Sequence, residues 1–167
     1  MLEDMRVYIA NLGKYNEGYL VGGWFSFPLD EEEIAERIGL NAEYEEYAVH
    51  DTDNFPMEVS EYTSISELNR IYELLEDLPD YILDNLNPFL SHYGTLEELD
   101  EHVDDIICHS GCNSMEDVGR FYAEELGMLG EIPPHLEYYI DYEAYGRDLE
   151  MNGTFIDTSY GICEIIR

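Results

Sequence analysis

The spacing of apolar and polar residues predicts strands near the N-terminus of this chain. RVYIANLG (6–13) and YLVGGWFSF (19–27) are rich in β-branched and aromatic residues and flank a glycine-containing connection, which predicts the two strands of a hairpin. EEYAVHD (45–51) predicts a further strand. Asp30 and Gly39 bracket EEEIAERI, and an aspartate cap followed by a terminal glycine predicts a short helix there.

The middle of the chain has helical spacing instead. Ser64 and Glu67 form a capping box, in which a hydroxyl and a carboxylate satisfy free backbone N–H groups at the start of a helix. Pro79 fits the first turn of a second helix, and Thr95 with Glu98 forms another capping box. The apolar positions that should face inward are Leu68, Ile71, Leu75, Leu78, Ile82, Leu86 and either Phe89 or Leu90. We expect a small helical bundle.

Mixed spacing returns after about residue 106. Ser114 is placed to cap a helix through MEDVGRFYAEEL. IPPHLEYYIDYEAYGRDL (132–149) begins as a loop and continues as a helix, and an Asn-Gly turn signal follows it. TFIDTSYGICEII (154–166) then predicts two closing strands, of which we assign the last, ICEII, to the core.

The order of these elements predicts an α+β fold in three small domains. We expect an N-terminal α+β domain (1–61), a central helical domain (62–105) and a C-terminal α+β domain (106–167). NFPMEV breaks the strand pattern just before the first boundary, and no long linker separates the parts.

Charge is the property in which this chain departs furthest from an ordinary domain. Its 167 residues include 39 Asp and Glu against seven Lys and Arg, a formal charge of −32, whereas a small domain commonly carries a net charge of magnitude about 2–8. Self-repulsion on this scale destabilises the compact state. Direct binding to nucleic acid or to an anionic membrane requires basic residues, so the composition argues against both.

The compartment can also be inferred from the sequence. Three cysteines are too few for a disulfide scaffold. The N-terminal MLEDMRVYIANLG has acidic residues where a signal peptide has basic ones, and no run approaches the ~20 apolar residues of a membrane span. We expect a soluble, reduced, cytoplasmic protein.

Metal and catalytic motifs are weak throughout. CHSGC (108–112), with His92 and His102 upstream, lacks the second ligand pair of a structural zinc site. DTDNFPMEVSEY (51–62) begins like a calcium loop but has proline where that loop needs glycine. No phosphate-binding loop, GxSxG or HExxH motif occurs. We expect no metal, no cofactor and no enzymatic activity.

The segment TLEELDEHVDD (95–105) concentrates the negative charge. On a helical wheel its acids gather on one side, opposite an apolar side, and no Lys or Arg occurs between Arg70 and Arg120, a stretch that holds thirteen acids. Six carboxylates between residues 97 and 105 would lie along roughly 12 Å of helix. That is about one charge per 2 Å, close to the one per ≈ 1.7 Å of duplex DNA.

Three interpretations of this charge stay open. A protein that imitates DNA would present such a line of charge to the groove of a nucleic-acid enzyme. Halophilic adaptation also produces acidic, lysine-poor surfaces, although the large apolar and aromatic content argues against it. An acidic binding or chaperone-like protein for other basic, nucleic-acid-binding partners would carry the same charge.

Four segments resemble the ArdA family of antirestriction proteins, which travel on mobile elements such as conjugative plasmids and conjugative transposons. They are VYIANLGKYNEG (7–18), GGWFSFPLD (22–30), YTSISELNRIYELLEDLP (62–79) and LEYYIDYEAYGRDLE (136–150). The resemblance runs from about residue 6 to the C-terminus, and YIDYEAYGRDL is its most specific part.

This resemblance implies a function and an architecture. Members of the family inhibit Type I restriction-modification enzymes by binding the methyltransferase core as a decoy with the shape of bent duplex DNA. They are elongated, with three small domains in series, and form homodimers through the C-terminal domain. Residues 139–150 overlap the segment known as the antirestriction motif.

Fifteen carboxylates are our candidate partner-binding residues. They comprise the acidic face of 95–105, acids of the neighbouring predicted helices, and acids of the motif that the resemblance identifies. They are Asp80, Asp84, Glu97, Glu98, Glu101, Asp104, Asp105, Glu116, Asp117, Glu124, Glu125, Asp141, Glu143, Asp148 and Glu150.

Overall fold

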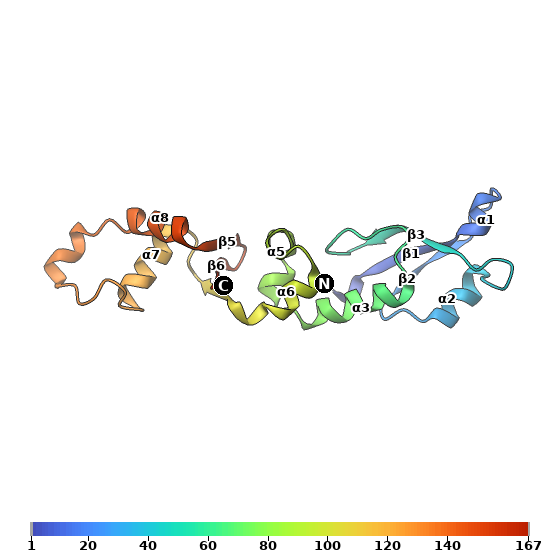
Figure 1. Ribbon diagram of the computed structural model, residues 1–167, viewed down its shortest axis with the longest axis horizontal. Coiled ribbons are helices and arrows are strands. Elements are labelled where there is room, and N and C mark those ends of the chain that lie inside the picture. The colour runs from blue at the N-terminus through green and yellow to red at the C-terminus, as the bar shows by residue number, and fades with distance from the viewer. Residues whose placement is uncertain (1, 167) are drawn as a thin grey trace. The chain divides into compact units, whose positions relative to one another are not determined.

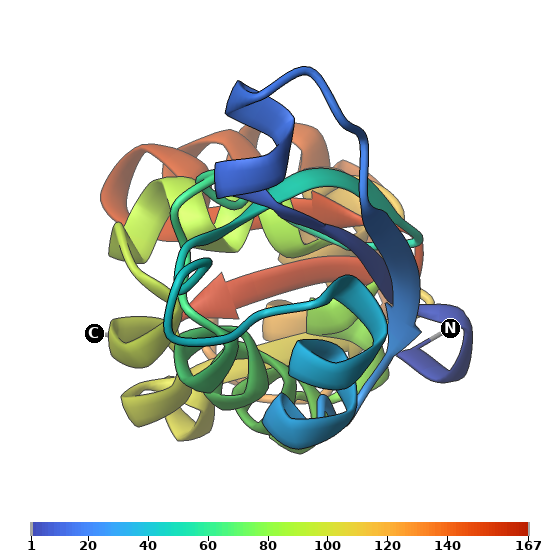
Figure 2. The same cartoon turned by 90° about the vertical axis from the view of Figure 1, so that its right-hand side faces the viewer.

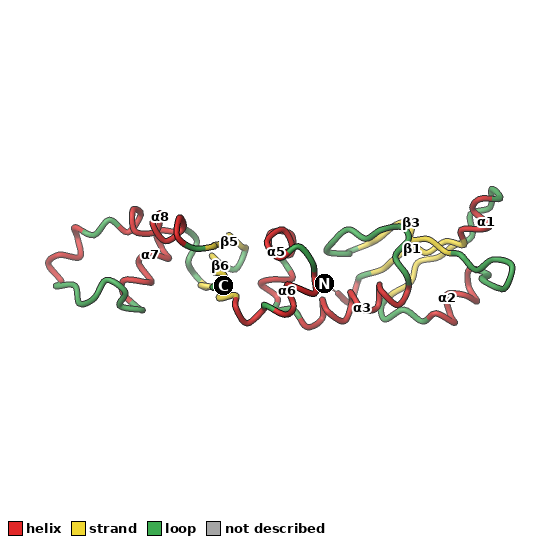
Figure 3. The backbone as a smooth tube through the Cα atoms, in the orientation of Figure 1, coloured by secondary structure: helices red, strands yellow, loops and turns green. Residues whose placement is uncertain are grey.

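The computed structural model describes residues 2–166 and has an α+β fold (Figure 1). The strands form two separate three-stranded antiparallel sheets, drawn in yellow in Figure 3. The chain divides into two compact units, the first ending at Leu78 and the second beginning at Pro79. In residues 2–166, no helix combines the length and apolar character needed to cross a bilayer.

The first unit is built on a sheet with the strand order β2-β1-β3. Its elements are η1 (Leu2–Asp4), β1 (Arg6–Asn11), α1 (Leu12–Asn16), β2 (Gly22–Ser26), α2 (Glu31–Ile38), β3 (Tyr47–Asp53) and α3 (Ile65–Asp77). Because β1 pairs antiparallel with β2, the predicted hairpin pairing is confirmed, although a short helix interrupts the connection. Figure 2 turns this unit toward the viewer, with α2 in light blue beside the strands.

The core of the first unit lies between the sheet, α2 and α3. Val7, Ile9 and Ile34 are completely buried, and Ile65 and Leu68 of α3 belong to the same cluster. The caps are those expected from the sequence: Asp30 accepts from the backbone N–H groups of the first turn of α2, and the Ser64 hydroxyl accepts from Glu67 N at 3.1 Å. Helix α3 therefore packs with the strands that precede it, and the division into three domains stays a prediction.

The second unit contains the other sheet, with the strand order β4-β6-β5. Its elements are α4 (Asp80–Leu83), α5 (Leu86–Tyr93), α6 (Leu96–Glu101), η2 (Val103–Asp105), β4 (Ile106–Ser110), α7 (Met115–Glu124), η3 (Pro134–Tyr139), α8 (Tyr142–Asn152), β5 (Thr154–Thr158) and β6 (Gly161–Ile165). Both closing strands are confirmed. Ile162, Cys163 and Ile165 of β6 are buried, as expected for a core strand.

The predicted helix after Pro79 is shorter than the apolar spacing indicated. The helix expected from Pro79 onward is divided into α4 and α5 at Asn85, whose side-chain amide donates to Tyr81 O at 3.1 Å and to Ser159 Oγ at 3.0 Å. Ser159 N in turn donates to Asn85 Oδ1 at 3.1 Å. These bonds tie the break to the β5–β6 turn, a contact that helical periodicity cannot reveal.

The acidic segment 95–105 is not a single α-helix, so that prediction was wrong. Thr95 caps α6 as expected, but α6 ends at Glu101 and a 3-10 turn follows. Ile106 then begins β4, opposite Ile165 of β6. Pairing with β6 therefore makes the apolar residues that directly follow the segment a strand.

Helices α7 and α8 approach closely through two glycines. A Cβ on Gly119 would lie 2.8 Å from Tyr142 O, and a Cβ on Gly146 would lie 2.1 Å from Met115 O. Any side chain at either position would collide with the backbone of the other helix. Gly146 lies within YIDYEAYGRDL, so this part of the sequence has a packing role besides its charge.

Candidate functional site

All fifteen candidate carboxylates lie in the second unit. They occupy α4 and the residue after it (Asp80, Asp84), α6 (Glu97, Glu98, Glu101), η2 (Asp104, Asp105), α7 and its cap (Glu116, Asp117, Glu124, Glu125) and α8 with its cap (Asp141, Glu143, Asp148, Glu150). Twelve are exposed, while Glu97, Asp105 and Asp117 are half-buried. Most of the set is therefore available to a partner.

Several of these acids have structural roles. Asp117 Oδ2 accepts from Asn113 N at 2.9 Å, and Asp141 caps α8 by accepting from Ala144 N at 3.0 Å. Asp84 accepts a hydrogen bond from the Tyr160 hydroxyl at 2.5 Å, and this bond raises the pKa of Tyr160. Such carboxylates contribute to the fold whether or not a partner binds.

Others are paired with the few cations of the unit. Residues 79–166 contain twenty carboxylates but only two arginines. Arg120 lies 3.9 Å from Glu116 and 3.7 Å from Glu124, while Arg147 lies 3.5 Å from Glu143. All of these side chains are roughly half exposed or more, so each pair contributes little to stability.

His102 occupies the acidic segment itself. Its Nδ1 lies 3.0 Å from Asp105 Oδ2, and its Nε2 lies 3.9 Å from Glu98 Oε2. Its ring stacks on that of Tyr93, with 5.5 Å between centroids. The side chain is thus engaged by Glu98, Asp105 and Tyr93. Among residues 2–166, no group of three or more His, Cys, Asp or Glu side chains could hold a metal ion.

Six of the candidate acids are exposed, and their side-chain carboxylates accept no hydrogen bond and form no ion pair with any group in residues 2–166. We call them the unpaired acids: Asp80, Glu101, Asp104, Glu125, Asp148 and Glu150. A carboxylate of this kind is available to an external cation.

The ends of the helices make some of these acids unfavourable for folding. The C-terminus of a helix carries partial negative charge and is stabilised by cations. Yet Glu101 ends α6, Glu125 follows the last residue of α7, and Glu150 lies in the last turn of α8. No basic residue occupies the last turn of any of these three helices as the structure describes them. Folding alone does not account for carboxylates at these positions.

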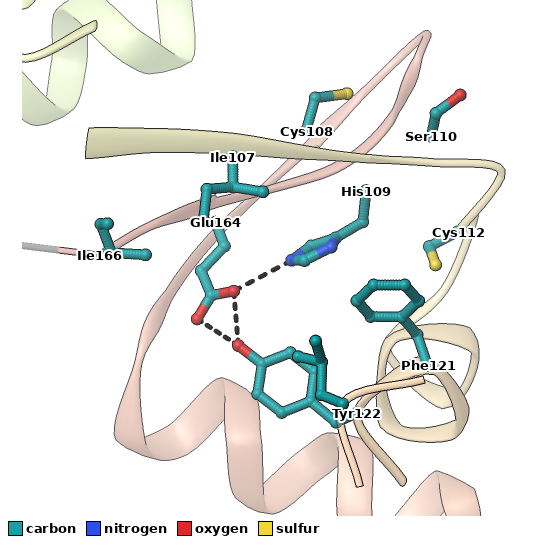
Figure 4. A pocket seen from close by; sticks show the side chains of 10 residues that line it. Ile107, Cys108, His109, Ser110, Cys112, Phe121, Tyr122, Glu164 and Ile166 are labelled. Atoms are coloured by element: carbon teal, nitrogen blue, oxygen red, sulfur yellow. Dashed lines mark hydrogen bonds and ion pairs between the residues drawn. The ribbon is translucent and has the colours of Figure 1, made fainter. Parts of the chain in front are cut away.

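The second unit also contains a pocket of about 390 Å³ (Figure 4). Figure 4 shows Glu164 of β6 reaching toward His109 of β4 and Tyr122 of α7. Glu164 Oε2 lies 3.0 Å from His109 Nε2, and the Tyr122 hydroxyl donates to both carboxylate oxygens. The sequence carried no signal for this cluster, because its members are far apart in the chain and match no motif.

The polar side chains of this pocket form a hydrogen-bonded cluster with a structural role. Burial, followed by the hydrogen bond to Glu164, raises the pKa of Tyr122, so its hydroxyl stays protonated at neutral pH. Burial also raises the pKa of the Cys112 thiol, which lowers its reactivity. We interpret the cluster as a link between β4, β6 and α7.

Comparison with known proteins gives one match. A family model described as Antirestriction protein (ArdA) matches residues 7–164 of the 167-residue chain. No curated protein matches the chain.

Proposed function

The chain belongs to the ArdA family of antirestriction proteins, and from that premise we propose that it occupies the DNA-binding groove of a Type I restriction-modification enzyme as an imitation of bent duplex DNA. The family is one of inhibitors of restriction, not one of enzymes. The proposed target surface is the methyltransferase core, whose DNA groove must present cations to phosphates.

One observation carries this proposal: the second unit exposes carboxylates that its own cations cannot neutralise. Two arginines face twenty acids in residues 79–166, and both arginines are already engaged with glutamates. The six unpaired acids therefore add to a field that attracts a basic groove. Three of them occupy helix ends where they oppose folding, which favours a role in binding.

The spacing of charge in the acidic segment still approaches that of DNA. Six carboxylates lie between residues 97 and 105. With ~1.5 Å per residue in α6 and ~2.0 Å in the 3-10 turn, the segment spans roughly 14 Å, or about one charge per 2.3 Å. The 3-10 turn lengthens the segment slightly but keeps its charge density comparable with the ≈ 1.7 Å spacing of the duplex.

We also propose that two copies associate through the C-terminal part of the chain. Residues 126–139 expose large apolar side chains, among them Met128 at 63%, Tyr138 at 91% and Tyr139 at 78%. Exposed apolar patches of this kind mark interaction surfaces. Light scattering on the wild type and on a Met128→Ser/Tyr139→Ser variant tests this, since the variant should shift toward the monomer.

Competition at two salt concentrations tests the decoy. The protein is titrated against a Type I restriction enzyme bound to a labelled DNA duplex at 50 and 200 mM NaCl. We expect displacement of the DNA that weakens as salt rises, because the contacts are ionic. Displacement that does not depend on the salt concentration would contradict ionic mimicry. If the protein displaced no DNA at either concentration, an acidic binding protein for other basic partners would be the better account.

Two matched variants locate the binding surface. One replaces the six unpaired acids by Asn or Gln, and the other neutralises six exposed acids of the first unit: Glu36, Glu43, Glu45, Glu46, Glu58 and Glu61. Both variants change the net charge equally. We expect the first to lose at least tenfold more inhibition than the second, and equal losses would mean that total charge, and not these positions, decides binding.

Single substitutions should have small effects under the same proposal. A solvent-exposed ion pair contributes about 0–1 kcal/mol, so neutralising one unpaired acid should weaken inhibition by no more than about fivefold. If one such change abolished inhibition in a folded protein, the distributed electrostatic mechanism would be wrong.

A further inference from the structure

Two of the three cysteines lie directly opposite each other on neighbouring strands. Cys108 of β4 is the register partner of Cys163 of β6. At the end of this ladder, Ile166 N donates to Asp105 O at 2.9 Å, so Asp105 and Ile166 are a hydrogen-bonded pair. This pair lies three positions along the ladder from Cys108 and Cys163. Because the two kinds of pair alternate along an antiparallel ladder, Cys108 and Cys163 form a non-hydrogen-bonded pair.

The geometry of such a pair matches that of a disulfide. Directly opposed residues at a non-hydrogen-bonded position have Cα atoms ≈ 4.5 Å apart, with their side chains on the same face of the sheet. A disulfide needs Cα atoms 4.4–6.8 Å apart. Burial raises the pKa of the Cys163 thiol, and the Cys108 thiol raises it further. Both thiols are free in this structure.

The third cysteine belongs to the other face of the sheet. Cys112 packs with Val118 and Ile162 beside α7. In Figure 4 the side chain of Cys108 points to the opposite side of β4 from Ile107 and His109, which face the pocket. Tyr81 of α4 lies on the Cys108 side, where its hydroxyl contacts Ile106 O at 3.3 Å. Only one of the three possible pairings is therefore aligned.

We propose that Cys108 and Cys163 are a redox modification site that closes to an intramolecular disulfide in the presence of a peroxide. Cys108 is half-buried, whereas Cys163 is completely buried. The Cys108 sulfur attacks one peroxide oxygen, the O–O bond breaks, and a sulfenic acid and water result. The Cys163 sulfur then displaces the hydroxyl group, which leaves as a second water when the Cys163 proton is transferred. Two thiols are oxidised and one peroxide is reduced to two waters.

The disulfide would close a long loop of the chain. Positions 108 and 163 enclose α7, α8 and β5, and a cross-link around a long loop restricts the unfolded chain more than the folded one. The raised pKa of Cys163 makes the second step slow at neutral pH, because a thiolate attacks faster than a thiol. This inference does not depend on the proposed function.

Thiol mapping on the full chain tests the proposal. The reduced protein is treated with hydrogen peroxide, denatured, alkylated with iodoacetamide, digested and analysed by mass spectrometry. We expect a peptide pair joined through Cys108 and Cys163, an alkylated Cys112, and the loss of two free thiols per chain. The melting temperature should rise by roughly 10 °C and return to its first value after dithiothreitol.

Serine variants serve as controls. Cys112→Ser should keep the disulfide and the shift in melting temperature, whereas Cys108→Ser should lose both. Because Cys163 is completely buried and its replacement could prevent folding, the half-buried Cys108 is the informative position. The proposal is overturned if all three thiols stay alkylatable, if Cys112 enters the disulfide, or if Cys108 ends as a sulfinic or sulfonic acid.

Discussion

Glu164 connects three elements of the second unit, namely β6, β4 and α7. Its side chain is only 17% exposed, and it accepts hydrogen bonds from a residue on α7 while facing another on β4. A buried carboxylate is costly unless hydrogen bonds satisfy it. The acids of this chain therefore fall into two kinds. Some stabilise the fold through hydrogen bonds, and others add negative charge to the surface.

Replacing Tyr122 by phenylalanine tests the first kind. The change removes the hydroxyl that donates to Glu164, and losing a hydrogen bond to a charged group should lower the free energy of unfolding by about 1–3 kcal/mol. Urea denaturation at pH 7 measures it. Tyr138→Phe is the control, because Tyr138 is 91% exposed and should change stability very little.

The same variant should alter the dependence of stability on pH. The fold raises the pKa of Tyr122 above its ordinary value of 10.0, so the folded state holds this proton more tightly than the unfolded state does. The resulting stability is complete below pH 10 and declines as pH rises through the folded-state pKa. Other tyrosines with raised pKa values, such as Tyr81 and Tyr93, contribute in the same direction. Tyr122→Phe should therefore show a smaller loss between pH 9 and 11, and an unchanged loss would contradict this role.

At the scale of the element, helices show where charge serves folding and where it opposes it. Glu116 lies in the first turn of α7 and Glu124 in its last, yet both pair with Arg120 four residues away. Their side chains are similarly exposed, at 51% and 43%. The two glutamates differ mainly in their position relative to the helix dipole, which favours an anion at the N-terminus only.

Neutralising these two glutamates separately should have opposite effects on stability. Glu116→Gln should lower the free energy of unfolding by about 0.3–1 kcal/mol, whereas Glu124→Gln should leave it unchanged or raise it by a similar amount. Thermal unfolding of the two variants, measured side by side, checks this. Inhibition of the restriction enzyme should fall slightly and equally for both, so a loss that tracked stability would argue against a purely electrostatic role.

At the scale of the whole molecule, the formal charge of −32 opposes folding and favours binding to a cationic partner. Salt screens both effects, since the Debye length shortens from 30 Å at 0.01 M to 3 Å at 1 M. Stability and affinity should therefore respond to salt in opposite directions. This opposition separates a decoy from an acidic protein adapted to high salt.

Unfolding and inhibition should be measured over one range of NaCl, from 0.01 to 0.5 M. We expect the melting temperature to rise with salt, because self-repulsion is screened, while inhibition falls, because the ion pairs with the groove weaken. Potassium glutamate in place of NaCl controls for specific effects of chloride. A protein that stays unfolded throughout this range of NaCl would support the halophilic interpretation.

Local features of this fold could be read from the sequence because they depend on residues only a few positions apart. Asp30, Ser64, Thr95 and Ser114 each cap the helix predicted for them, through bonds to backbone groups two or three residues away. The predicted strands near both ends are present as well. The excess of negative charge, from which the candidate site was inferred, needs no structure at all.

Tertiary structure decided the features that join distant parts of the chain. Only the return of β6 alongside β4 begins a strand directly after the acidic segment, brings Glu164 to His109, and aligns Cys108 with Cys163. It also separates the acids that cap or pair from the six that remain unpaired. Side-chain charge and capping act over a few residues and are encoded locally, whereas strand register and burial arise only when segments some fifty residues apart pack together.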